Sequence, residues 1–312
     1  MSLFLQELVV GISTGAIYAL IALGYTMVYG IIELINFAHG DIFMIGSLIS
    51  IVILDLLGIT TTSQPTGFTL LAVMLAACLG SIVLCAILGM VIERVAYRPL
   101  RNAPRLAPLI SAIGVSLILE DIGKLWKGVN NVPFPQIFPQ ITYNIGPVNI
   151  SGVNILVLIV AVVLMVALQW FVTSTRTGRA MRAVAQDREA AALMGVNVDR
   201  VISITFLIGA GLAGAAGFVY GLQYGSTIFS LGLPIGLVAF TAAVLGGIGN
   251  IVGAMLGGLL IGLIDALSTL IPDTVLPHGG TPWHNAIIFA ILILILIFRP
   301  SGLLGQHTPE KV

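Results

Sequence analysis

The first run of residues that could do chemistry extends from Glu33 to Asp41, Glu-Leu-Ile-Asn-Phe-Ala-His-Gly-Asp, and joins two apolar stretches. If those stretches cross a membrane, Asn36, Phe37, His39 and Asp41 are candidates for lining a translocation pathway, because ionisable groups at membrane depth are usually functional. The run also fits a plain turn in which Asn36 and Asp41 cap the following helix. The two interpretations are compatible, and both stay open.

A second polar run, residues 175–200, is rich in alanine and arginine. Apolar residues at Met181, Val184 and Ala192 predict one or two short amphipathic helices that lie on a membrane surface. Gly195 is placed to end the second of these helices as a C-cap. The run is either a charged loop that only fixes orientation or a docking surface for a cytoplasmic partner.

A third region, residues 229–248, is apolar but is interrupted by Pro234 and several glycines. Proline cannot donate to the helical hydrogen-bond ladder, so this segment either crosses the membrane as a broken helix or dips in and turns back. Interrupted helices often build transporter sites near the midplane, which makes Pro234 a further pathway candidate. This interruption in the second half of the chain corresponds to the one near Asn36 in the first half, which hints at an internal repeat.

Small residues recur at every fourth position in two stretches. This spacing keeps them on one helix face and favours close helix packing, with a glycine-lined path as the alternative. The two stripes are Gly209, Ala213, Gly217, Gly221 and Gly225, and Ala254, Gly258, Gly262 and Ala266.

Motifs for catalysis and nucleotide binding are missing. The sequence has no Gly-x-x-x-x-Gly-Lys-Ser/Thr, His-Glu-x-x-His, Cys-x-x-Cys or Gly-x-Ser-x-Gly. Its 4 histidines have no metal-ligand spacing. Cys78 and Cys85 share one apolar run, about 10 Å apart along a helix, which is too far for a disulfide. We therefore predict a chain that is not an enzyme, with no catalytic residues, no metal site and no cofactor of its own.

These residues must be positioned by membrane helices. The chain is 58% hydrophobic and only 8% charged, with a mean hydropathy of +1.10, whereas soluble domains carry about 25% charged residues. Its net charge of zero gives no basic excess for a nucleic-acid partner. We predict one all-α polytopic domain over 1–312, a bundle of about 8–10 transmembrane helices with broken or re-entrant segments and a cytoplasmic coupling helix.

A bilayer core of roughly 30 Å needs about 20 apolar residues per helix. The expected spans are 8–31, 41–58, 68–92, 106–123, 152–173, 201–223, 251–271 and 283–298, with 229–248 as a further candidate. No polar stretch between them is long enough to fold as a separate soluble domain.

Positive charges predict the orientation, because cytoplasmic loops carry an excess of arginine and lysine. The loops 128–151 and 272–282 lack both and are expected to face outward, with Lys124 and Lys127 as a mild exception. The side of the N-terminus stays open. The charges expected on the cytoplasmic side are Arg94, Arg98, Arg101, Arg105, Arg176, Arg179, Arg182, Arg188, Arg200, Arg299 and Lys311.

Glu189-Ala190-Ala191 followed by Gly195 resembles the Glu-Ala-Ala…Gly loop of ATP-binding-cassette importer permeases, although Thr205 departs from the wider pattern. Longer stretches are similar, in order and over nearly the whole chain, to the LivH-type permeases of branched-chain amino-acid importers. These stretches are 36–41, 178–185, 246–258 and 299–305.

The resemblance implies a multi-pass permease subunit of the bacterial inner membrane that moves branched-chain amino acids. It implies a second homologous permease, two cytoplasmic ATPase subunits that use the ATP, and a periplasmic substrate-binding protein. The coupling loop, 176–200, would then be cytoplasmic. The residues expected at the ATPase interface are Arg179, Arg182, Glu189, Ala190, Ala191 and Gly195.

Other functions remain open at this point. A relative in the same importer class could carry urea, short amides or another small amino acid. A secondary transporter or channel that works alone would need charged groups within its spans, for which Glu120, Asp121 and Asp265 are the candidates. An intramembrane enzyme would need a nucleophile and base that the sequence does not offer.

Overall fold

The computed structural model describes residues 2–60, 63, 65–101, 103–104, 106–139, 141–146, 148–299 and 301–305. Three residues used above, Arg105, Pro300 and Lys311, lie outside this described part.

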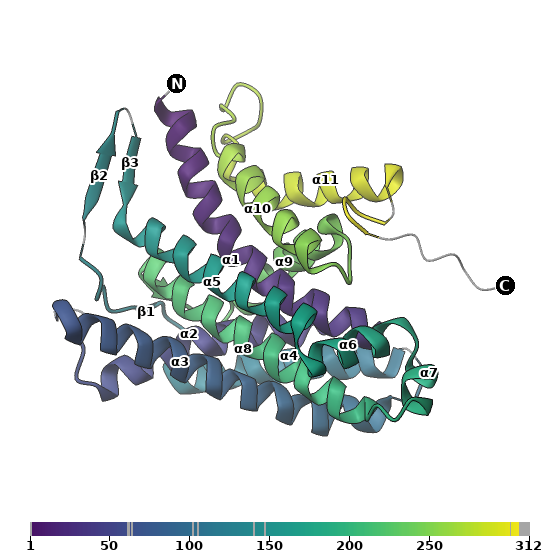
Figure 1. Ribbon diagram of the computed structural model, residues 1–312. Coiled ribbons are helices and arrows are strands. Elements are labelled where there is room, and N and C mark those ends of the chain that lie inside the picture. The colour runs from purple at the N-terminus through teal and green to yellow at the C-terminus, as the bar shows by residue number, and fades with distance from the viewer. Residues whose placement is uncertain are drawn as a thin grey trace.

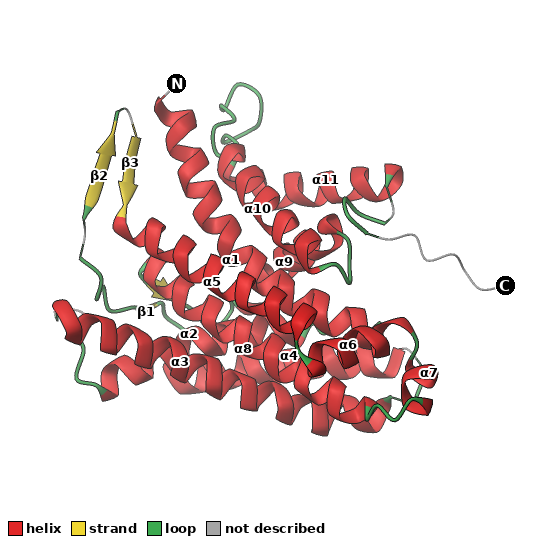
Figure 2. Ribbon diagram, in the orientation of Figure 1, coloured by secondary structure: helices red, strands yellow, loops and turns green. Residues whose placement is uncertain are grey.

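The described chain is helical apart from two small antiparallel strand pairs (Figures 1 and 2). Strand β1 (Val132–Pro133) pairs with β4 (Ser226–Thr227), and β2 (Thr142–Ile145) pairs with β3 (Val148–Ser151) in a hairpin. The helices are α1 (Ser2–Ile32), α2 (Ala38–Leu56), α3 (Gly67–Ile92), the π-helix η1 (Glu93–Tyr97), η2 (Arg98–Leu100), α4 (Leu106–Lys127), α5 (Gly152–Ser174), α6 (Arg176–Gln186), α7 (Arg188–Leu193), α8 (Val198–Tyr224), α9 (Gly232–Gly246), α10 (Ile251–Ser268), η3 (Thr281–Trp283) and α11 (His284–Phe298).

Within the described residues, 8 helices are long and apolar enough to cross a membrane. They match the eight expected spans, with ends that differ by a few residues because caps and turns extend or trim the apolar runs. The further candidate, 229–248, forms α9, which at 15 residues is shorter than a full span. The prediction of an all-α polytopic membrane protein with about eight spans is therefore confirmed.

The two ends of the bundle are distinguished by their contacts. At the hairpin end, the Gln6 side-chain amide donates to the Asn149 carbonyl at 2.9 Å, so the start of α1 lies beside β3. At the other end, which we call the arginine end, Arg188 donates to the carbonyl of Ile31 near the end of α1. The N-terminal helix therefore begins on the side of the 128–151 loop, which is predicted to face outward.

Residues 226–246, which include β4 and α9, cross the bundle rather than turning back. It starts at the hairpin end, where Thr227 of β4 pairs with Val132. It finishes at the arginine end, where Gly246 accepts a hydrogen bond from the Leu304 N–H at 3.0 Å. The non-helical residues 225–231, followed by the short helix α9, thus cross in place of one continuous spanning helix.

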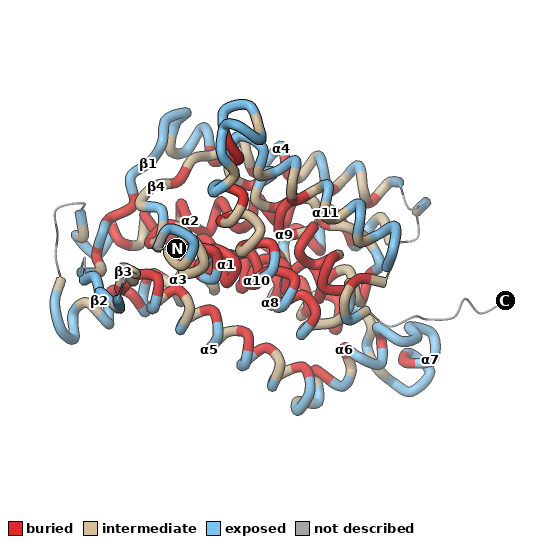
Figure 3. The backbone as a smooth tube through the Cα atoms, turned by 90° about the horizontal axis from the view of Figure 1, so that it is seen from above, coloured by how far each residue is buried: buried red, intermediate tan, exposed pale blue. Residues whose placement is uncertain are grey.

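Helix α1 runs through the centre of the bundle, with the buried helix α8 and one face of α10 packed against it (Figure 3). The seam between α1 and α10 is made of small residues: a Cβ at Gly15 would lie 2.8 Å from the Leu259 Cα, and one at Gly11 would lie 3.1 Å from the Ala266 Cβ. The stripe in α8 packs on more than one element: a Cβ at Gly217 would lie 2.6 Å from the Ser47 nitrogen of α2, and one at Gly209 would lie 3.3 Å from the Gly24 carbonyl oxygen of α1. The packing interpretation of both stripes is confirmed.

Large apolar side chains remain exposed along the peripheral helices α3, α4, α5 and α11. An apolar surface of this kind is stable only in lipid or against another membrane subunit. The structure thus gives a densely packed centre with a lipid-compatible rim.

Candidate coupling and pathway sites

The run 175–200 folds into the two short helices that its pattern predicts. The Thr175 hydroxyl accepts from the Gly178 N–H at 3.0 Å and caps α6, and the Asp187 carboxylate accepts from the Ala190 N–H at 3.0 Å and caps α7. Gly195 has a φ of +83° and closes α7, because its N–H donates to Ala192 while that of Val196 donates to Ala191. Gly195 thus ends α7 as predicted, one position beyond the C-cap residue Met194.

Five of the six residues expected at the ATPase interface are exposed, and the sixth, Ala191, lies on the buried face of α7. Arg182 and Arg179 also donate to carbonyls at the end of α5, namely Thr173 at 3.2 Å and Ser174 at 3.4 Å, and so help to hold α6 against it. The exposed five are Arg179, Arg182, Glu189, Ala190 and Gly195.

The most exposed part of α7 is its apolar tip, which the sequence analysis did not single out. Leu193 is 89% exposed and Met194 is 85% exposed. Two such side chains beside a helix end form a patch that is better covered by a partner than by water. The signal in the sequence is weak, because Leu-Met after three alanines also fits the buried face of a helix.

Arg188, the first residue of α7, ties the coupling loop to α1. Its Nη2 and Nε donate to the Ile31 carbonyl at 2.6 and 3.1 Å. This carbonyl belongs to the last turn of α1, whose carbonyls lack helical partners. The chain then reverses at Glu33, which adopts a φ of +58°. A movement of α7 would therefore pull directly on the end of α1.

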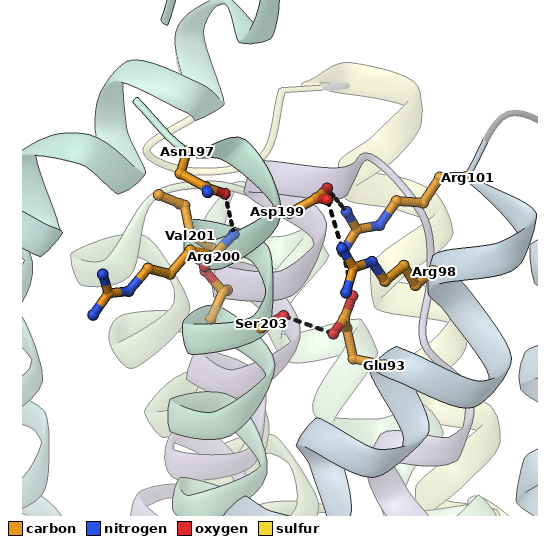
Figure 4. A network of polar contacts seen from close by, with 9 residues as sticks. Glu93, Arg98, Arg101, Asn197, Asp199, Arg200, Val201 and Ser203 are labelled. Atoms are coloured by element: carbon orange, nitrogen blue, oxygen red, sulfur yellow. Dashed lines mark hydrogen bonds and ion pairs between the residues drawn. The ribbon is translucent and has the colours of Figure 1, made fainter. Parts of the chain in front are cut away.

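A polar network joins the end of α3 to the start of α8 (Figure 4). Arg101 forms ion pairs with both Glu93 and Asp199, and Arg98 pairs with Asp199 at 2.9 Å. The Ser203 hydroxyl donates to the second oxygen of Glu93 at 2.7 Å. The Glu93 side chain is fully buried, so its charge depends on these partners.

Sequence reasoning counted these arginines only as markers of orientation. The available signal was the single acid, Glu93, next to the arginine cluster. Its partner Asp199 lies about a hundred residues further along the chain and could not be paired from the sequence.

Three polar side chains of the run between α1 and α2, those of Asn36, His39 and Asp41, are buried where α2 begins. The Tyr97 hydroxyl donates to Asn36 Oδ1 at 2.7 Å, and the Ser116 hydroxyl donates to the Asp41 carboxylate. The His39 ring packs edge-on against Tyr25 with 4.7 Å between ring centroids. We call Asn36, His39, Asp41, Tyr97 and Ser116 the break cluster.

The capping prediction for this run was wrong. The N-cap position of α2 is Phe37, and no side chain caps the helix there. Asn36 precedes the cap and its oxygen is taken by Tyr97, while Asp41 lies within the first turn and binds Ser116. Tertiary partners thus replace the local capping bonds that the sequence suggested.

The two breaks in the chain meet in space, because the first turn of α9 packs on the first turn of α2. A Cβ on Gly236 would lie 3.0 Å from the Gly40 Cα and 3.0 Å from the Tyr25 hydroxyl. The sequence predicts that Pro234 interrupts a helix, but this was wrong. Pro234 lies in the first turn of α9, where an N–H would have no helical partner. Pro234 is exposed and stays outside the break cluster.

The structure thus brings Asn36, His39 and Asp41 together, leaves Phe37 partly buried beside them, and keeps Pro234 apart. None of these five pathway candidates lines either of two pockets at the arginine end.

In the last turn of α10, Asp265, a candidate for a charged group within a span, accepts a hydrogen bond from the Tyr18 hydroxyl at 2.9 Å. The described residues contain no group of three or more side chains arranged to hold a metal ion.

The described helices are those of a multi-pass membrane protein, with two short capped helices at one end of the bundle. The chain belongs to the family described as branched-chain amino acid transport system / permease component, which matches residues 8–296. The resemblance to LivH-type permeases is thereby confirmed, and the chain is a transport protein without a catalytic domain.

The most similar relatives include two bacterial permeases. The high-affinity branched-chain amino acid transport system permease protein LivH of Escherichia coli K12 is 44% identical over 99% of this chain and 98% of its own length. The corresponding protein BraD of Pseudomonas aeruginosa is 43% identical over 99% and 98%. Among solved structures, PsaBC from Streptococcus pneumoniae in complex with Fab aligns over 96% of this chain and 92% of that chain at 12% identity, with a TM-score of 0.47, too low to equate the two folds.

Proposed function

We propose that this chain is the permease subunit of an ATP-binding-cassette importer that moves branched-chain amino acids inward across the bacterial inner membrane. The observation that supports this most strongly is the 44% identity to LivH over 99% of the chain. The partners are a second homologous permease, two cytoplasmic ATPase subunits and a periplasmic substrate-binding protein. ATP is used by the ATPase subunits, since this chain has no P-loop.

In this proposal residues 176–200 are the cytoplasmic coupling loop of a single permease domain, 1–312. Arg179, Arg182, Glu189, Ala190 and Gly195 face the ATPase, and Ala191 supports them from beneath. The exposed tip at Leu193 and Met194 would enter an apolar groove of the ATPase, which favours docking by burial of apolar surface.

The coupling loop is connected to three membrane helices. Arg188 holds the end of α1, α8 follows directly after α7, and Asp199 in the first turn of α8 pairs with the arginines after α3. The π-helix η1 begins with Glu93 and ends with Tyr97, which donates to Asn36. A displacement of α7 by the ATPase would therefore reach the break cluster through a series of backbone connections and side-chain bonds.

Coupling of this kind requires two conformations of the permease that the ATPase distinguishes by its nucleotide state. We assign the break cluster, together with the neighbouring Phe37, to the hinge beside the pathway. Its burial in one chain supports a hinge better than a pore lining. Pro234, exposed at the start of α9, would face the pathway between the two permeases.

The test is reconstitution of the permease pair, the ATPases and the binding protein in liposomes. L-Leucine, L-isoleucine and L-valine should stimulate ATP hydrolysis and be taken up, whereas urea and acetamide should do neither. Stimulation by urea or amides would instead assign the chain to the alternative within the same importer class. Uptake by this polypeptide alone, without ATPases, would assign it to the secondary transporters or channels.

A further inference from the structure

A pocket of about 170 Å³ opens at the arginine end, between α7 and the membrane helices. Its wall combines the end of α1, the linker after it, α4, α7 and α8, so any occupant would touch both the coupling helix and the helices that it moves. The residues that matter for its chemistry are Glu33, Arg188, Arg101, Ile32, Leu34 and Ile202.

The pocket carries one free charge of each sign. The Glu33 carboxylate has no hydrogen bond or ion pair among the described residues, and no described hydrogen bond uses Nη1 of Arg188. Arg101 contributes little free charge because Glu93 and Asp199 already pair with it. Glu33 and Arg188 line the same pocket and form no ion pair with each other, so one acidic and one basic residue are available to an occupant.

The remaining wall is aliphatic, with Ile32, Leu34 and Ile202 beside the two charges. A guanidinium binds a carboxylate, a carboxylate binds an ammonium group, and aliphatic walls bury an apolar side chain. These three features together match a zwitterionic amino acid that carries an apolar side chain. Neither a simple anion nor a simple cation would satisfy both charges.

The backbone at Glu33 adds an independent observation. Its φ of +58° is uncommon for a residue other than glycine, and strained residues of this kind concentrate at functional sites. The Glu33 N–H donates to the Tyr29 carbonyl at 2.7 Å, so the strained conformation is anchored on α1. The anchored turn keeps Glu33 at the pocket wall, directly after the end of α1.

We propose that this pocket binds a free α-amino acid with an apolar side chain from the cytoplasmic side, and that the bound amino acid restrains α7 and slows further import. The amino acid would bridge Glu33 on the α1–α2 linker and Arg188 on α7. Since Arg188 also holds the end of α1, a bridged pocket would fix the coupling helix in one position. The regulatory part rests on the proposed function, and the binding part does not.

The test uses liposomes that contain the complete importer with ATP inside, and measures the initial rate of labelled L-leucine uptake from the external binding protein. Unlabelled L-leucine enclosed with the ATP should slow uptake. Leucinamide lacks the carboxylate and 4-methylpentanoate lacks the ammonium group, so neither should slow it at the same concentration. In Glu33→Gln, the internal leucine needed for half-maximal slowing should rise about tenfold or more, since a bond to a charged group is lost.

Asp273→Asn is the matched control, because it removes an exposed acid from the loop that follows α10, at the hairpin end. It should be slowed by internal leucine as the wild type is, and both variants should transport normally from empty liposomes. If Glu33→Gln assembles poorly, Leu34→Trp, which fills the pocket, should abolish the effect of internal leucine instead.

Three outcomes would overturn the proposal: no slowing in the wild type, equal slowing in Glu33→Gln, or slowing by 4-methylpentanoate, which would indicate an anion site only. Failure of the proposed function is separate, since it would remove ATP-dependent leucine uptake even from liposomes with no internal amino acid.

Discussion

The seam between α1 and α10 and the polar network at the arginine end both hold helices together, but by different means. The seam brings backbones into contact through small residues, among them Gly11, Gly15 and Gly262. The network joins α3 to α8 through the side chains of Arg101 and Asp199, which span the space between the helices. The seam leaves no room for the two helices to pack differently, whereas the polar network depends on side-chain bonds that can be exchanged.

This difference separates a scaffold from a movable part. Interdigitated backbones resist sliding because any shift creates overlap, and tightly packed interiors transmit strain. The exposed ion pair between Arg98 and Asp199 can break and re-form at modest cost, whereas the buried pair between Arg101 and Glu93 stays fixed at the end of α3. A permease that must change shape needs both, and the movable contacts lie where the ATPases are proposed to dock.

The largest loss of stability should follow Arg101→Ala. It would leave the buried Glu93 carboxylate without its ion-pair partner, and breaking a buried pair from one side costs about 3–5 kcal/mol. Thermal or denaturant unfolding in detergent would measure the effect. Lys127→Ala is the control: its pair with the exposed Asp55, 3.7 Å away, should contribute about 0–1 kcal/mol. Equal losses in the two variants would contradict the buried role of the network.

A smaller loss should follow Gly262→Ala in the seam. The added methyl group would collide with the backbone of α1 at Gly15, and overpacking of this kind typically costs about 1–3 kcal/mol. In the control, Gly114→Ala, the new Cβ in α4 meets nothing within 4 Å, so the variant should be as stable as the wild type or slightly more so. Unfolding of both variants in the same detergent gives the comparison.

Gly195→Pro should leave membrane insertion intact but uncouple transport. Proline cannot adopt the φ of +83° or donate the hydrogen bond to Ala192, so the end of α7 would be remodelled. Gly58→Pro is matched to it, because Gly58 has a φ of +73° just beyond α2 at the opposite end and donates to Asp55. Leucine uptake and ATP hydrolysis in liposomes would be lost only in the first variant. Unimpaired uptake in Gly195→Pro would count against the coupling assignment.

The least change in stability is expected for Leu193→Ser, since the side chain is already exposed. The affinity of the Leu193→Ser permease for the ATPase should nevertheless fall about tenfold, because the variant loses an apolar side chain that the interface would bury. Val275→Ser, which alters an exposed apolar residue in the loop after α10, should change neither property. Co-purification of the ATPase at graded salt and protein concentration would measure the difference, and equal retention by both variants would remove Leu193 from the interface.

The parts of the fold that could be predicted are those set by local rules. The eight spans follow from apolar length, the two helices of the coupling loop from their amphipathic pattern, and the turn at Gly195 from its place after the alanines. The candidate site was only partly predictable. Local preference allows Asn36 and Asp41 to cap a helix or to line a pathway, but their side chains bind Tyr97 and Ser116 from other helices.

The sequence by itself determined that the chain lies in lipid, where it crosses, and which short segment forms a surface helix, because hydropathy, helix periodicity and glycine conformation are local properties. The tertiary structure alone decided that α1 is the centre of the bundle, that the two chain breaks meet, and that Arg188, Glu93 and Asp199 tie the coupling loop to three membrane helices. Such pairings join residues far apart in the chain. They depend on how whole helices pack, which no local pattern encodes.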